Sequence, residues 1–203
     1  MTLKRTATAL VAIAAGIALL AGCSPTSGAQ PTKSSSPAPT STSAGPVDPP
    51  KSEDEAVKAA EKALTEWFVV RGEVNAGGGK DTARLEKVAT GNALTISQND
   101  AKHVATGPIL NADQKNIDGP AKTEGAIKYE PISAYGQAYE GVENGLVTVN
   151  ACQDASGYKV FASDGSPAMT PPSLRNKLDY QVVYDAKAKA WLVFDSVSLN
   201  QTC

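Results

Sequence analysis

Few side chains in this sequence could support acid–base, nucleophilic or metal chemistry. The 203 residues contain one histidine, His103, and three cysteines, Cys23, Cys152 and Cys203. This small number restricts sites that need several imidazole or thiolate ligands, and it restricts histidine-dependent catalysis. The sequence has no Walker loop and no GxSxG, HExxH or CxxC motif. We therefore expect no metal, no cofactor and no catalytic residue.

Cys23 stands at the end of an apolar run. Lys4 and Arg5 come first, the residues from Ala7 to Leu20 are almost all apolar or small, and Gly22 precedes the cysteine. The run is shorter than the roughly 20 residues that a membrane-spanning helix needs. A basic segment, an apolar segment and small residues in this order are typical of a secretory signal peptide.

The residues "LAGC", which end at Cys23, resemble the lipobox of bacterial lipoproteins. The resemblance implies cleavage between Gly22 and Cys23 and a thioether-linked diacylglycerol on the Cys23 sulfur. Acyl chains of the palmitate type would then hold the protein at the outer face of the cytoplasmic membrane, because two chains suffice for stable anchoring. The alternative is ordinary secretion, with cleavage after a small residue and an incidental cysteine.

The composition divides the chain into three parts. We expect a lipoprotein signal peptide in 1–22, the lipidated cysteine and a disordered tether in 23–51, and a globular domain in 52–203. Ser, Thr, Pro, Ala and Gly dominate the tether, and Val47 is its only large aliphatic residue. Such a segment cannot bury enough apolar surface to offset the entropy of ordering the chain.

The globular domain is predicted to begin with a helix. Ser52 and Glu55 have the spacing of a capping box, and the acidic residues between them suit the positive end of the helix dipole. An apolar stripe follows at helical spacing, and the glycines at 77–79 end the helix. The stripe consists of Ala56, Val57, Ala60, Ala63, Leu64, Trp67, Phe68, Val70 and Val74.

The remaining sequence predicts a second helix and then a sheet. The helix is expected to start at Asp81 with a break at Gly91, and residues 107–125 read as a loop with turn signals. From Ala126 onward, runs rich in β-branched and aromatic residues alternate with short turns, which indicates about 4–6 antiparallel strands. Helices followed by strands are typical of the α+β class. One strand should place four residues on one face: Leu178, Tyr180, Val182 and Tyr184.

Cys152 and Cys203 form the pair that remains once Cys23 is assigned to the anchor. Outside the cytoplasm a disulfide between them is the expected state. It would close a loop of about 50 residues and fasten the C-terminal end. Two free thiols or an intermolecular bridge are the alternatives.

A few side chains could line a pocket in the domain. Trp67, Tyr135 and Asp195 are the candidates, although aromatic residues at these spacings are more often part of a core. Asp195 is the better candidate for an inward-facing carboxylate, since Asp179 alternates with apolar residues and should face solvent. A solvated Asp195 is the favoured interpretation, and His103 is expected to be a surface or capping residue rather than a general base.

The globular part resembles small actinobacterial and actinophage lipoproteins with a nuclear transport factor 2-like fold. The resemblance rests on the lipobox and tether, "EWF" in the first helix, "VTVNACQD" at 147–154, "SDGS" at 163–166 and the closing "WLVFDSVSLNQTC". It implies that a curved antiparallel sheet wraps the N-terminal helices into a cone with an apolar mouth. That fold hosts isomerases, dehydratases and many domains without catalysis, so it does not by itself define a function.

These observations favour a membrane-anchored, extracytoplasmic binding or interaction module without catalysis, with interference with phage entry as one version if the gene lies in a prophage. The partner would be a protein of the cell envelope or a small apolar ligand. Nucleic acid is not expected, because 19 basic residues stand against 21 acidic ones and no basic stripe occurs. The alternatives are a subunit of an envelope transport or secretion assembly and a small-molecule isomerase or dehydratase of the ketosteroid-isomerase type.

Overall fold

The structure is a computed structural model that describes residues 46–203. The signal peptide, the predicted lipidation site at Gly22 and Cys23, and the tether up to residue 45 lie outside the described residues. Within this range the helices come first and the strands follow. The helices are α1 (Glu53–Ala76), the 3-10 helix η1 (Thr82–Lys87) and α2 (Gly91–Thr106). The strands are β1 (Ile109–Leu110), β2 (Asn116–Ile117), β3 (Lys122–Glu124), β4 (Lys128–Tyr139), β5 (Val142–Asp154), β6 (Lys159–Phe161), β7 (Arg175–Asp185) and β8 (Ala190–Thr202).

Helix α1 begins with the predicted capping box. The Glu55 backbone N–H donates to the Ser52 hydroxyl at 3.3 Å, and the Glu55 carboxylate accepts from the Lys51 backbone N–H at 2.8 Å. The first bond satisfies one of the backbone donors that the first turn of a helix leaves unpaired. The second goes to the residue before the N-cap, whereas in a full capping box the Glu55 carboxylate would accept from the Ser52 N–H. The predicted apolar stripe is confirmed, since the buried residues of α1 include Ala56, Ala60, Leu64, Trp67, Val70 and Val74.

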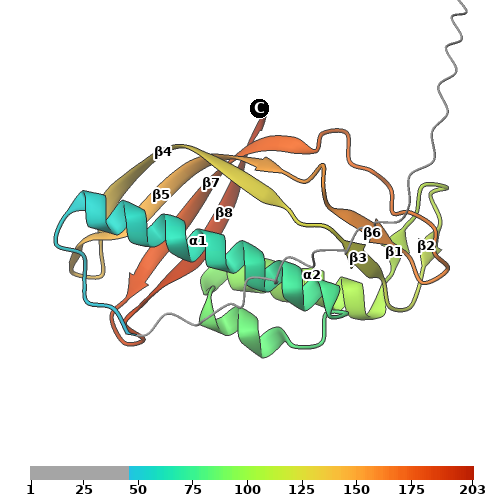
Figure 1. Ribbon diagram of the computed structural model, residues 1–203, viewed down its shortest axis with the longest axis horizontal. Helices are drawn as coiled ribbons and strands as arrows, with labels where there is room; N and C mark the ends of the chain where they lie inside the picture. Colours follow the sequence, from blue (N-terminus) through green and yellow to red (C-terminus); the bar gives the residue numbers. More distant parts are fainter. Residues whose placement is uncertain (1–45) are drawn as a thin grey trace, which may run out of the picture. The chain divides into compact units, whose positions relative to one another are not determined.

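The four long strands form one antiparallel sheet in the order β4-β5-β7-β8. Helix α1 lies across this sheet (Figure 1). The predicted alternation in β7 is confirmed, because Tyr180, Val182 and Tyr184 belong to the buried core and Leu178 packs against it. On the same side of the sheet, β5 contributes Val147, Val149 and Ala151. The core therefore lies between α1 and one face of the sheet.

The region after α1 differs from the predicted second helix. Only η1 covers the expected start, and α2 begins at Gly91, whose φ of 55° few other residues adopt. Between the two, the chain runs along the edge of β8. The Val193 N–H donates to the Val88 carbonyl oxygen at 3.1 Å, and the Thr90 N–H donates to the Val193 carbonyl oxygen at 2.8 Å. This pairing covers part of an otherwise free sheet edge.

Residues 107–125 do not form the predicted loop. Strand β1 pairs with β2, and β3 pairs with β6, so two small antiparallel ladders occupy this region. Figure 1 shows these short strands gathered beyond the long sheet. The partner of β3 lies far along the sequence, so the local pattern of residues 107–125 could not indicate it.

The prediction of a nuclear transport factor 2-like cone is wrong. The described residues form helices followed by an open sheet of four strands, an arrangement that is compatible with the α+β class but is not that cone. Strand β6 leaves the main sheet to pair with β3 instead of extending it. The space between α1 and the sheet is filled by core side chains, including the fully buried Leu64, Trp67 and Tyr180.

Cys152 and Cys203 form the predicted disulfide, with their Cα atoms 5.9 Å apart. The bond joins β5 to the residue that follows β8, and β7 lies between these strands in the sheet. The C-terminal end is therefore fastened across a neighbouring strand. No helix within residues 46–203 combines the length and the apolar character needed to cross a membrane.

Candidate ligand-binding cleft

The three residues predicted to line a pocket do not converge. Trp67 is 1% exposed in the core, where its indole N–H donates to the Ser97 hydroxyl at 3.0 Å. Tyr135 and Asp195 belong to one row across the sheet, in which the register runs from Tyr135 through Thr148 and Gln181 to Asp195. Residues of such a row share a face, and Gln181 alternates with the core residue Tyr180, so this row faces away from the core.

A β-bulge explains why Asp195 turns away from the core. Val193 pairs with Val182 and Asp195 pairs with Gln181, which leaves Phe194 as an extra residue in β8. The extra residue breaks the alternation on which a sequence-based assignment depends. The Asp195 carboxylate accepts from the Asn92 side-chain amide and from the Ser196 backbone N–H, both at 2.7 Å.

The other acid–base candidates also lie away from the core. His103 is exposed in the last turn of α2, and the Asp179 carboxylate accepts from the Asn150 side chain at 2.8 Å. Among residues 46–203, no histidine or acidic residue is buried; the buried polar residues are Asn75, Ser97, Asn111, Thr123 and Thr148. No group of three or more His, Cys, Asp or Glu residues in this range could hold a metal ion.

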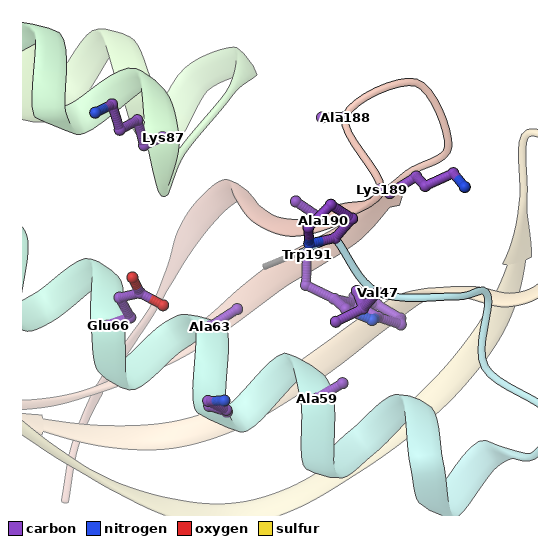
Figure 2. A pocket seen from close by; sticks show the side chains of 11 residues that line it. Val47, Ala59, Ala63, Glu66, Lys87, Ala188, Lys189, Ala190 and Trp191 are labelled. Carbon is purple, nitrogen blue, oxygen red and sulfur yellow. The ribbon is translucent and has the colours of Figure 1, made fainter. Parts of the chain in front are cut away.

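A cleft lies beside α1 at the β7–β8 hairpin (Figure 2). It has a volume of about 310 Å³, which is at the lower end of the usual range for small-ligand sites. Its lining combines small apolar residues, one indole and four charged side chains. The lining residues are Pro46, Val47, Ala59, Lys62, Ala63, Glu66, Lys87, Ala188, Lys189, Ala190 and Trp191.

The cleft remains open because alanines line it on two sides. Ala59 and Ala63 are four residues apart on α1, so they lie one above the other on the same helix face. Figure 2 shows both methyl groups directed toward the region of Trp191 and Val47. A longer aliphatic residue at either helix position would reach into this space. The small side chains thus leave an apolar floor uncovered next to the Trp191 ring.

One wall of the cleft is the strap, which we define as Pro46 and Val47. The Val47 N–H donates to the Lys189 carbonyl oxygen at 2.8 Å, and the Tyr184 hydroxyl donates to the Val47 carbonyl oxygen at 2.8 Å. Tyr184 is 2% exposed, and this burial raises the pKa of its phenol. The neutral hydroxyl is therefore kept as the donor that holds the strap.

The rim of the cleft is positively charged. Lys62, Lys87 and Lys189 are exposed, and Glu66 is the single acidic residue of the lining. Within residues 46–203, no ion pair of 4.0 Å or less involves any of these four side chains. The lysine charges are therefore available to an anionic group at the rim.

Other hollows of the described residues lack this combination. A groove of about 520 Å³ lies between residues 155–161 and 167–174, and Lys159 is its single charged residue. Another groove of about 470 Å³ lies beside Phe68 and Tyr129, with Lys128 as its single charge. The cleft at the hairpin is distinguished by three lysines around an apolar floor.

The sequence did not identify this cleft. The four charged lining residues come from α1, η1 and the hairpin, and their proximity depends on how these elements pack. Val47 is the only large aliphatic residue in the segment assigned to the tether, and it lines the cleft. It is held through its backbone N–H and carbonyl oxygen, which no side-chain pattern indicates.

No protein-family model and no curated protein matches this chain. A solved structure that is similar to it is the crystal structure of the intermembrane space region of chloroplast protein ARC6. The similarity has a TM-score of 0.47 at 14% sequence identity, and it covers 71% of this chain and 96% of that chain.

Proposed function

We propose that this protein is a lipid-anchored, extracytoplasmic binding module that performs no catalysis. The observation that carries the proposal is the "LAGC" sequence at the end of a signal-like apolar run. Cys23 is the anchor, and the chain from residue 24 to the strap is the tether that links it to the folded domain. The partner is an apolar or amphiphilic ligand, or a protein of the cell envelope.

Two features of the domain support a binding role. The cleft offers an apolar floor with a charged rim, which suits recognition of a ligand that has an apolar and a polar part. The second feature is that the general-base candidates predicted from the sequence, His103 and Asp195, do not belong to the lining of this cleft. A general base must lie within hydrogen-bond reach of the substrate, so acid–base chemistry at the cleft would depend on Glu66 or a rim lysine instead.

Cell fractionation tests the anchor and its side of the membrane. The full chain and its Cys23→Ser variant are expressed in a bacterial host, with Ser24→Ala as the matched control. We expect the unaltered chain and Ser24→Ala in the membrane fraction, where protease added to cells with a permeabilised wall digests the domain. Cys23→Ser should not be matured and should lack the lipid. The proposal fails if the unaltered chain is soluble, or if the protease cannot reach it.

A further inference from the structure

We propose that the cleft at the β7–β8 hairpin binds a single-chain amphiphile with an anionic head group. The apolar chain lies on the floor formed by Ala59, Ala63 and Trp191, and the head group lies among the rim lysines. This inference deepens the proposed function by naming a ligand class. The source of the ligand, a lipid of the membrane that holds Cys23, rests on the proposed function. The binding of an anionic amphiphile by the cleft does not.

The apolar lining of the cleft favours an apolar chain. Ala59 and Ala63 line it from α1, Ala190 and Trp191 line it from β8, and Val47 lines it from the strap. The Trp191 side chain is 8% exposed, so the cleft exposes only part of a large apolar surface. Covering this surface with methylene groups removes apolar area from water on both partners, which favours association.

The charges at the rim favour an anionic head group. Lys62 and Lys189 stand on opposite sides of the cleft, one on α1 and the other on the hairpin, and Lys87 adds a third positive charge from η1. This local excess contrasts with the whole chain, which has more acidic than basic residues. Figure 2 shows the Lys189 side chain extended outward, where its flexible stem can follow a head group at the rim.

The strap connects the cleft to the tether. Pro46 and Val47 line the cleft, and the chain that leads to Cys23 leaves from Pro46. A domain anchored through Cys23 therefore has this cleft at the point where its tether begins. An anionic membrane surface also attracts lysines that come within about a Debye length of it, roughly 10 Å. We therefore assign the membrane as the source of the ligand, which is one of its lipids.

Fluorescence quenching tests the ligand class on the full chain, reconstituted in nanodiscs of neutral phosphatidylcholine. The probe is a stearic acid with a nitroxide on its chain, which quenches an indole that it contacts. We expect saturable quenching for the unaltered chain. The methyl ester of the same probe keeps the chain and removes the charge, and it should need at least a tenfold higher concentration for half-saturation.

Paired variants locate the site. Ala63→Phe fills the floor, and the double variant Lys62→Glu with Lys189→Glu reverses the rim charge. Each should raise the half-saturating concentration at least tenfold. The matched controls are Ala76→Phe and the double variant Lys80→Glu with Lys102→Glu, since these residues are exposed and lie outside the cleft, and they should leave the half-saturating concentration unchanged. The charge variants and the ester keep the test valid if Ala63→Phe does not fold.

The proposal is overturned if quenching does not saturate, if acid and ester quench alike, or if the folded cleft variants match their controls. The source is tested separately by the lipids that copurify with the chain. An anionic membrane lipid lost from the cleft variants supports the membrane source, whereas free fatty acid alone rejects that source and keeps the ligand class. If the unaltered chain carries no lipid on Cys23 and still shows saturable quenching, the anchor is rejected and the cleft proposal stands.

Discussion

The buried Tyr180 shows how a polar atom is accommodated in this core. Tyr180 is fully buried, its ring lies edge-on to Trp67 and Phe68, and its hydroxyl donates to the Gln153 side-chain oxygen at 2.8 Å. Burial raises the pKa of this phenol well above its ordinary value of 10.0, while the positive charge of Arg71 opposes the rise. The neutral form is therefore strongly preferred in the folded protein.

The raised pKa of Tyr180 predicts a loss of stability at alkaline pH. The unfolded chain loses the phenolic proton near pH 10, whereas the folded chain retains it, so stabilisation is complete below pH 10 and falls as the pH rises toward the folded pKa. In the unaltered chain this group should make the free energy of unfolding fall by about 1.4 kcal/mol for each pH unit above pH 10. Tyr180→Phe should remove that contribution to the pH dependence. Urea unfolding between pH 8 and about pH 11 measures it. Equal alkaline slopes for both proteins would contradict the account.

At the scale of elements, the sequence predicted what local patterns determine. The capping box at Ser52 and the stripe through Trp67 depend only on neighbouring residues, so α1 was predicted with its correct ends and buried face. The ladder between β3 and β6 depends on a partner far along the chain, and the face of Asp195 depends on the bulge at Phe194. No local pattern indicated either feature, and the cleft depends on packing of the same kind.

The glycines after α1 allow a test of how closely the chain packs against α2. Gly78 and Gly79 have φ values of 81° and 71°, so alanine is strained at both positions. A Cβ atom at Gly79 would also collide with the Ala101 carbonyl oxygen of α2, whereas a Cβ atom at Gly78 meets nothing within 4 Å. The close approach of the chain to α2 therefore depends on Gly79.

Alanine substitution should separate backbone strain from this close approach. Gly78→Ala should lower the free energy of unfolding by about 1–2 kcal/mol through strain alone. Gly79→Ala should lower it by the same amount plus about 1–3 kcal/mol, because the chain and α2 must move apart. Urea unfolding of both variants gives the difference. Equal effects would show that the contact with α2 does not contribute.

At the scale of the whole molecule, the two ends of the described chain are both attached to the sheet. The strap is held by Tyr184 and Lys189 at one end, and the disulfide between Cys152 and Cys203 holds the other. The cysteines are 51 residues apart in sequence. The bond therefore restricts a large part of the unfolded chain, and its effect on stability should be correspondingly large.

Removing the disulfide should destabilise the domain by about 4 kcal/mol on the loop-entropy relation. Cys203→Ser is the suitable variant, since Cys203 is exposed and the substitution leaves no cavity. Urea unfolding with and without a thiol reductant measures the effect. The reductant should bring the unaltered chain to the stability of the variant and should not change the variant. A variant as stable as the oxidised chain would contradict this role.

The proposed function requires that Cys23 carries a lipid which holds the domain at a membrane. Intact-mass analysis of the full-length gene product, purified from bacterial membranes, tests it most directly, with Cys23→Ser and Ser24→Ala alongside. The account predicts that the unaltered chain and Ser24→Ala have the mass of residues 23–203 plus a thioether-linked diacylglycerol, and that Cys23→Ser lacks the lipid. A wild-type mass without lipid, with processing unchanged by Cys23→Ser, would contradict it.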